Sequence, residues 1–155
     1  MKDKVKWCFN IKAGLKLIKP NKNLSESYLK MAKDTIKLID DISSSKNILW
    51  ITVMCYYSSY YCVESFLSLI GVKSENHTCS ILLTKYLLGE EKTKIIEQEK
   101  RKRTDAQYYN KFVSSGELSS MNNDSKNFLI SFEYLINNLD EEKIKEYKDK
   151  IKALL

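Results

Sequence analysis

The sequence has few residues that break or bend a helix. Among 155 residues there are one proline and four glycines, the two residue types that most disfavour a helix interior. Hydrophobic residues make up 43% and charged residues 30%, which is typical of a globular domain with a buried core. The length corresponds to one domain. We therefore predict a single all-α domain spanning residues 1–155.

Histidine and cysteine are too sparse for the usual metal sites. His77 is the only histidine, and no Cys-x-x-Cys pair occurs among Cys8, Cys55, Cys62 and Cys79. Structural zinc sites need closely spaced ligands of these types, and no Gly-rich phosphate loop or His-Glu-x-x-His motif is present. We expect no metal and no cofactor. No secretory signal peptide is visible, so we expect a cytoplasmic protein whose cysteines are reduced thiols, mostly in the core.

The positive charge of the chain comes almost entirely from lysine. The net charge is +6, yet only Arg101 and Arg103 among 26 basic residues are arginine. Mild basicity fits a nucleic-acid partner, but it fits an ordinary solvated surface as well. Residues 1–22 carry seven lysines against Asp3. We expect this stretch to be a basic N-terminal extension packed on the bundle, with a short helix near residues 5–12 and a connector that ends at Pro20.

Residues 48–70 contain a single formal charge, Glu64. The segment is long enough to span a bilayer, but its serines and Glu64 suit a membrane poorly. A helix buried at the centre of a bundle is the better interpretation, with Gly71 as its natural end. We expect no membrane association.

Apolar residues recur at helical spacing in most of the chain. Further helices are predicted from about residue 24 to 40, 75 to 88, 90 to 109, and 119 to 138, with a last helix starting after Asp140, an N-cap residue. Lys46 is the predicted start of the central helix. No strand is predicted. The expected fold is a helical bundle of about five to six helices.

The predicted fourth helix carries the residues most suited to a binding site. Glu99, Arg103 and Gln107 are four residues apart and share a helix face, with Tyr108 about one turn beyond Arg103. An arginine fork beside a tyrosine hydroxyl suits a phosphate or a nucleobase edge. An ordinary surface pair of Glu99 with Arg103 explains the same spacing.

Glu64 and His77 are two further candidates. A buried carboxylate needs a partner, so we hypothesise that Glu64 pairs with Arg103, in either a structural or a catalytic role. His77 lies at a predicted helix start, where a histidine usually caps or packs rather than catalyses.

The order of these features resembles the HEPN family (higher eukaryotes and prokaryotes nucleotide-binding domain), in its minimal archaeal and bacterial form. Tyr56-Tyr57-Ser58-Ser59-Tyr60, followed by Gly71, is similar to the family's Tyr-Tyr-Ala-x-Phe-like sequence and its later glycine. Asn76-His77-Thr78 resembles the Ser-His turn of the family. Arg103, Ala106 and Tyr108 match an Arg-x-x-Ala-Asp-Tyr motif, with Gln107 in place of the aspartate.

The resemblance implies a homodimer that binds RNA or a nucleotide. It also implies a metal-independent endoribonuclease of a toxin–antitoxin pair, with a minimal nucleotidyltransferase as partner. Active members have four to six residues between the arginine and a histidine, and at the corresponding positions after Arg103 this chain has Tyr108, Tyr109 and Asn110. The expected ribonuclease is therefore degenerate. The alternative is a non-enzymatic helical interaction module that binds such a nucleotidyltransferase.

The resemblance and the spacing together define the expected site. The residues expected to act on RNA are Arg103, Tyr108 and His77. Those expected to bind RNA or a nucleotide are Arg101, Arg103, Asp105, Tyr109 and Glu64.

Overall fold

The computed structural model describes residues 1–45 and 47–155, and this part of the chain is mostly helical. Its α-helices are α1 (Lys2–Asn10), α2 (Lys22–Ile42), α3 (Ile48–Leu69), α4 (His77–Leu88), α5 (Lys94–Tyr109), α6 (Ser115–Asn137) and α7 (Glu141–Lys152). A 3-10 turn covers Ser43–Ser45, and two short strands are β1 (Leu15–Leu17) and β2 (Val72–Ser74). The helical class predicted from sequence is confirmed, with seven helices in the described residues rather than five to six.

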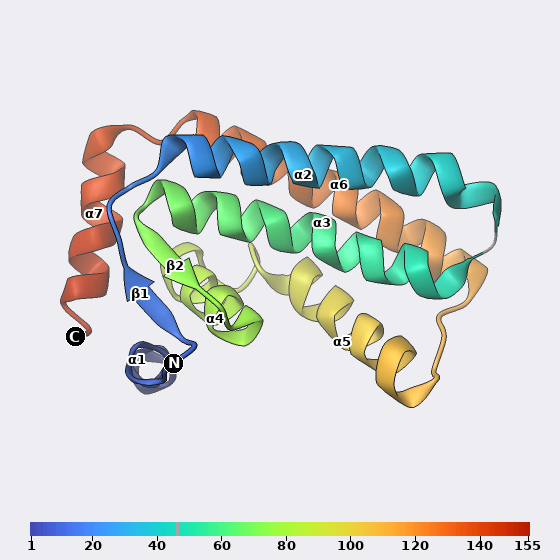
Figure 1. Ribbon diagram of the computed structural model, residues 1–155, viewed down its shortest axis with the longest axis horizontal. Coiled ribbons are helices and arrows are strands. Elements are labelled where there is room, and N and C mark those ends of the chain that lie inside the picture. The colour runs from blue at the N-terminus through green and yellow to red at the C-terminus, as the bar shows by residue number, and fades with distance from the viewer. Residues whose placement is uncertain (46) are drawn as a thin grey trace.

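Three long helices form the body of the molecule. Helices α2, α3 and α6 run side by side, and α3 contacts both others (Figure 1). Helix α5 packs along α3 on the opposite side from α2, while α7 lies across the end of the bundle where α2 begins (Figure 1). Helices α1 and α4 contact each other below the start of α2. The central position of α3 explains why most of its residues are buried.

Small hydroxyl residues allow α2 and α3 to pack closely. Ser65 Oγ donates to the carbonyl oxygen of Ser25 at 2.7 Å, and Ser58 Oγ donates to the carbonyl oxygen of Ala32 at 3.2 Å. All four residues are buried. The serines that make residues 48–70 a poor membrane span therefore serve as short side chains at a helix interface. No helix in the described residues combines the length and hydropathy needed to cross a membrane.

The prediction that the chain contains no strand is wrong. Strands β1 and β2 pair antiparallel, with Leu15 opposite Ser74 and Leu17 opposite Val72. Each strand has three residues, too few to show a two-residue alternation in the sequence. Their pairing depends on the turn at Gly71, whose carbonyl oxygen accepts from the Ile18 amide at 2.9 Å.

Cys8 and Cys79 form a disulfide that joins α1 to α4. The expectation of four reduced thiols is therefore wrong for this pair, while Cys55 and Cys62 are free and buried. The sequence could not show the pairing, because the two cysteines are 71 residues apart. Val5 and Cys8 place one side of α1 in the core.

Helix ends follow their capping residues, with shifts of a few residues from the predicted bounds. Asp140 caps α7, as predicted, by accepting from the Lys143 amide at 2.8 Å. Helix α2 begins earlier than predicted because Asn21 is its cap, and α6 begins earlier because Ser114 and Glu117 form a capping box. Helix α5 begins at Lys94 rather than residue 90. The predicted start of the central helix at Lys46 lies outside the described residues.

Candidate functional site

Arg103 lies among three tyrosine rings. Its guanidinium carbon is 5.5 Å from the ring centre of Tyr56, 5.8 Å from that of Tyr57 and 5.7 Å from that of Tyr108. These distances lie within the range of cation–π attraction. In the described residues no carboxylate lies within 4.0 Å of Arg103, and its buried Nε has no hydrogen-bond partner. The guanidinium is thus held by aromatic faces and keeps its donors for another group.

His77 reaches the same place from the first position of α4. Its Nδ1 is 2.8 Å from the Tyr56 hydroxyl, and its ring stacks on Tyr60 with centres 3.8 Å apart. Burial lowers the pKa of His77, and the charges of Arg103 and Lys100 lower it further. Burial also raises the pKa of Tyr56, so the phenol keeps its proton. A phenol that donates to Nδ1 leaves the imidazole proton on Nε2.

Lys100 completes a basic cluster, which we define as His77, Lys100 and Arg103. It precedes Arg103 by three residues on α5, and its Nζ donates to Thr78 Oγ1 at 2.5 Å. Burial lowers the pKa of Lys100, and the nearby charge of Arg103 adds to this effect. Like Arg103, Lys100 has no carboxylate within 4.0 Å in the parts of the chain that are described. The charge of Glu97 acts on Lys100 from a greater distance and opposes the lowering of its pKa. Two cations and an imidazole without a carboxylate in direct contact can bind an anion.

The hypothesis that Glu64 pairs with Arg103 is wrong. The Glu64 carboxylate is buried and accepts a hydrogen bond from Ser80 Oγ at 2.7 Å. Ser80 Oγ is also 3.3 Å from the Tyr60 hydroxyl. Burial raises the pKa of Glu64. The carboxylate therefore lies close to Ser80 and Tyr60, and hydroxyl groups satisfy it instead of a cation.

The alternative interpretation, in which Glu99 and Arg103 form a surface ion pair, is also wrong. Glu99 is 2% exposed and accepts from Ser125 Oγ of α6 at 2.6 Å. Residues four apart differ by about 40° around a helix axis. Glu99 faces the core, whereas Arg103 faces the tyrosine rings, so the two side chains do not contact each other.

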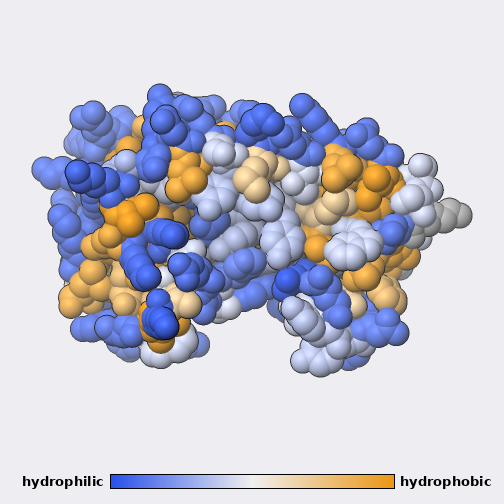
Figure 2. Space-filling view, in the orientation of Figure 1, coloured by the Kyte–Doolittle hydropathy of each residue, from blue (hydrophilic) through white to orange (hydrophobic). Residues whose placement is uncertain are grey.

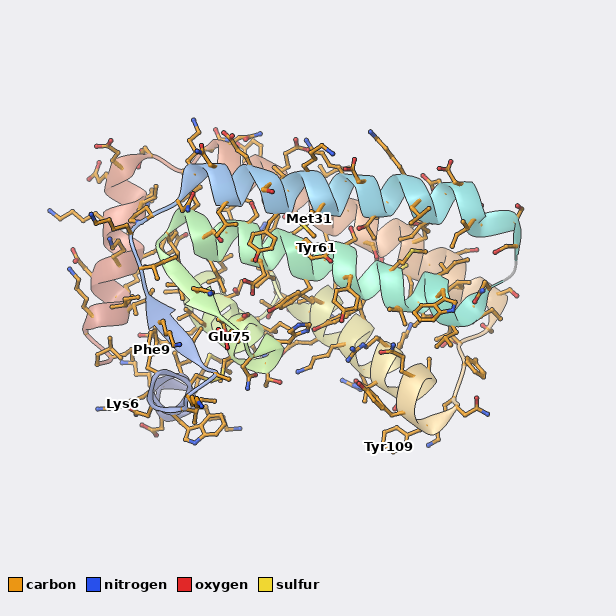
Figure 3. All side chains as sticks on the ribbon, in the orientation of Figure 1. Lys6, Phe9, Met31, Tyr61, Glu75 and Tyr109 are labelled. Carbon is orange, nitrogen blue, oxygen red and sulfur yellow. A yellow bond between two sulfur atoms is a disulfide. The ribbon has the colours of Figure 1, made fainter. Side chains whose placement is uncertain are left out.

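The remaining predicted residues divide into two groups. Tyr108 joins the cluster through Arg103, although its side chain is 68% exposed. Arg101 and Tyr109 are exposed, and Tyr109 lies at the far end of α5 (Figure 3). Asp105 contributes its carbonyl oxygen, which accepts from the Lys111 amide at 3.0 Å. None of these three contacts the basic cluster through an ion pair, a side-chain hydrogen bond or an aromatic contact within the described residues.

Of the predicted residues, Tyr108 lies beside Arg103, and His77 is joined to Arg103 through a residue that sequence reasoning did not single out. Tyr56 contacts both Arg103 and His77. The sequence feature that could have pointed to Tyr56 is the pair of adjacent tyrosines, Tyr56 and Tyr57, in the central helix. No protein-family model, curated protein or solved structure matches this chain. The candidate site therefore rests on its own geometry.

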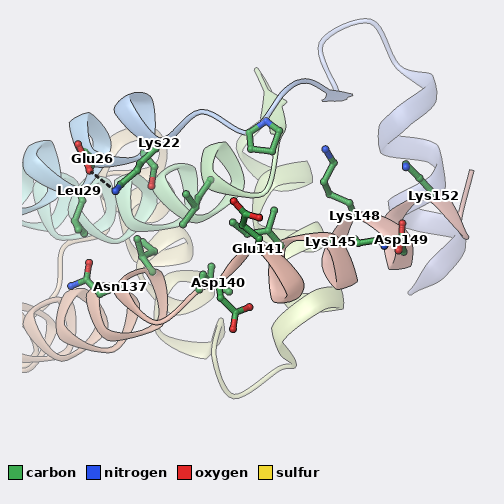
Figure 4. Close-up of a pocket in the computed structure, with 16 residues that line it drawn as sticks. Lys22, Glu26, Leu29, Asn137, Asp140, Glu141, Lys145, Lys148, Asp149 and Lys152 are labelled. Carbon is green, nitrogen blue, oxygen red and sulfur yellow. Dashed lines mark ion pairs between the residues drawn. The ribbon is translucent and has the colours of Figure 1, made fainter.

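The two helices that carry the basic cluster, α4 and α5, lie on the side of the molecule where its surface is notched. Figure 2 shows the notch at the lower edge of the face, between the region over α1 and α4 and the end of α5. A separate groove of about 980 Å³ lies at the other end of the bundle, between α2, α6 and α7 (Figure 4). Its lining holds Lys22, Lys145, Lys148 and Lys152, and also Glu26, Asp140, Glu141 and Asp149. Equal numbers of lysines and carboxylates give this groove no preference for an anion.

Proposed function

We propose that the protein binds RNA or a nucleotide through the basic cluster, as a HEPN-like protein. The observation that carries the proposal is the convergence of Arg103, Lys100 and His77 with no carboxylate partner in the described residues. A phosphate supplies the missing negative charge and accepts hydrogen bonds from the guanidinium. Tyr108, more than half exposed beside Arg103, offers a ring on which a base can stack.

The arrangement supports binding more strongly than RNA cleavage. Tyr108, Tyr109 and Asn110 occupy the positions at which the resemblance requires a histidine, and tyrosine is a poor proton shuttle near neutral pH. His77 is the only imidazole available, and Tyr56 occupies its Nδ1. An imidazole whose free nitrogen carries the proton donates to a phosphate oxygen more readily than it accepts a proton. We infer a degenerate ribonuclease in which phosphate binding persists.

The first prediction concerns Arg103. Arg103→Ala is expected to weaken binding of uridine monophosphate or single-stranded RNA by about 10- to 100-fold, the loss of a charged hydrogen bond. Calorimetry at one fixed salt concentration measures it, because phosphate contacts depend on salt. Arg101→Ala is the matched control: it removes the same charge from an exposed position on α5, and its effect should be smaller.

A gel assay for RNA cleavage accompanies the affinity measurement. Unchanged affinity in Arg103→Ala, with no cleavage by the wild type, would defeat the proposal. A cleaving wild type whose activity disappears in both Arg103→Ala and His77→Ala would support the ribonuclease in place of simple binding.

A second candidate function is a helical module that binds a minimal nucleotidyltransferase. It is favoured by the exposed aromatic residues at the end of α5 and just beyond it, Tyr108, Tyr109 and Phe112, which are 68%, 65% and 51% exposed. Exposed aromatic groups of this kind are common in protein interfaces. This candidate predicts that Arg103→Ala leaves nucleotide affinity unchanged, while Tyr109→Ala abolishes partner binding.

A further inference from the structure

A row of aromatic rings leads away from the basic cluster across α3 to α2. Tyr57 lies 5.4 Å from Tyr56, Tyr61 lies 6.0 Å from Tyr57, and Tyr28 of α2 lies 6.2 Å from Tyr61, measured between ring centres. We define Tyr57, Tyr61 and Tyr28 as the tyrosine strip. Arg103 packs against its first member, so the strip and the basic cluster are continuous.

Each ring of the tyrosine strip is partly accessible to solvent. Tyr28, Tyr57 and Tyr61 are each partly buried, unlike Tyr56 and Tyr60 beneath and beside them, which are buried. Figure 2 shows a pale band across the centre of this face, and Figure 3 labels Tyr61 there beside Met31 of α2. Met31 is 41% exposed. The face therefore presents the ring surface of the strip and the thioether of Met31 side by side.

The tyrosine strip carries no charge of its own. Burial raises the pKa of Tyr28 and Tyr61, so both phenols stay neutral near pH 7. Glu64, the carboxylate beneath Tyr28 and Tyr60, is buried and hydrogen-bonded to Ser80. A ligand on the strip thus meets ring surface, with the positive charge of Arg103 at one end.

Neutral rings continuous with an anion site suit single-stranded nucleic acid. Its unpaired bases stack on aromatic side chains, and a basic group holds the backbone. In a duplex the base faces are covered by their neighbours, so rings on a protein surface cannot reach them. The contacting rings of the strip leave no space for a base between them, so bases would lie on their open outer surface.

We propose that the tyrosine strip binds the bases of single-stranded RNA whose phosphate is held by the basic cluster. The inference rests on the proposed function and names its substrate class: an extended RNA strand in preference to a mononucleotide or a duplex. The strand would run from the notch at α5, across α3, toward Tyr28 on α2.

The length of the ligand tests the proposal first. Binding of fluorescent oligouridylate of about six nucleotides is compared with that of uridine monophosphate and of an RNA duplex of equal length. Wild type should bind the oligonucleotide at least about tenfold more tightly than either. Equal affinity for monophosphate and oligonucleotide, or tighter binding of the duplex, would overturn the inference and leave the proposed function intact.

Tyr61→Leu tests the strip directly, because leucine keeps apolar bulk and removes the ring. It should weaken oligouridylate binding by on the order of 5- to 100-fold, the usual effect of losing one base-stacking ring, and leave uridine monophosphate affinity unchanged. Tyr61→Phe, which keeps the ring, should bind like wild type. The matched control is Tyr134→Leu, at a tyrosine of α6 that is 72% exposed and outside the strip.

Equal oligonucleotide affinities of Tyr61→Leu and Tyr134→Leu would reject the strip. Loss of uridine monophosphate binding by Tyr61→Leu would also count against it, since the phosphate site should be unaffected. Circular dichroism checks that the variants fold, and Tyr28→Leu on the neighbouring helix provides a second, independent removal of a ring. Failure of the proposed function is a different result: Arg103→Ala would then bind both ligands as wild type does.

Discussion

Gly71 and Gly89 both have a positive φ, +80° and +91°, but their surroundings differ. A Cβ on Gly71 would lie 2.6 Å from the carbonyl oxygen of Ile18, whereas a Cβ on Gly89 would meet nothing within 4 Å. Gly71 therefore combines two requirements, a left-handed backbone and a close approach of two chain segments. Gly89 has only the first.

Alanine at these two positions separates the requirements. Gly89→Ala should lose about 1 to 3 kcal/mol of unfolding free energy, from backbone strain alone. Gly71→Ala should lose about 2 kcal/mol more, because the β1–β2 connection must shift to relieve the contact with Ile18. Urea unfolding of both variants measures the difference. Equal losses of unfolding free energy in the two variants would mean that the backbone near Ile18 moves away from the added Cβ at no energetic cost.

Arg103 shows what one residue reveals about a site before its neighbours are known. Its rarity in a lysine-rich chain and its spacing from Tyr108 identified it. Its predicted partners were wrong, because Glu64 bonds to Ser80 and Glu99 bonds to Ser125. The reason is that helical spacing gives an angle around one axis and does not say how a neighbouring helix is rotated.

At the scale of elements, α5 faces two different environments. One side carries Lys100 and Arg103 of the basic cluster. The other side buries Glu99 against α6, where one oxygen of the Glu99 carboxylate has no hydrogen-bond partner. Burial raises the pKa of Glu99 from 4.5 to about 8, with Asp124 adding to the rise and Ser125 and Lys102 opposing it. Helix α5 is thus joined to the core by a carboxyl group that is largely protonated at neutral pH.

This burial makes stability depend on pH. Below pH 4.5 the Glu99 carboxyl is protonated in both the folded and the unfolded chain. Between pH 4.5 and about 8 only the unfolded chain releases the proton, so the free energy of unfolding falls as pH rises, by on the order of 1 kcal/mol per pH unit. Above that pKa both states are ionised and the loss stops growing.

Glu99→Gln should remove most of this dependence, because glutamine keeps the shape and the acceptor for Ser125 without an ionisable proton. Urea unfolding of both proteins at pH 5 and pH 8 measures it. Relative to wild type, the variant is expected to be more stable at pH 8 than at pH 5. The same pH dependence in both proteins would show that Glu99 is not its source. Glu91→Gln, at an exposed carboxylate in the turn before α5, is the control.

At the scale of the whole molecule, the N-terminal segment is joined to the rest by contacts distant in sequence. The Cys8–Cys79 disulfide closes a loop of 71 residues and lies two positions from His77. Strand β1 adds a second connection through β2. A long loop is the case in which a disulfide restricts the unfolded chain most.

Reduction or Cys8→Ser should therefore lower the free energy of unfolding by about 2 to 4 kcal/mol. Thermal unfolding with and without a reducing agent measures the effect. The reducing agent should lower the midpoint of the wild type and leave Cys8→Ser unchanged. A wild type that does not respond to the reagent, although its thiols become titratable, would contradict a stabilising disulfide.

The sequence by itself determined the helical class, the buried central helix, and most helix ends to within a few residues, because periodicity and capping act over short stretches of the chain. Tertiary structure alone decided the β1–β2 pair, the disulfide, and the partners of Arg103, Glu64 and Glu99, since each depends on segments many residues apart. The continuity of the tyrosine strip with the basic cluster belongs to this second group. It requires α2, α3 and α5 to present their rings on one face, and no single helix encodes that arrangement.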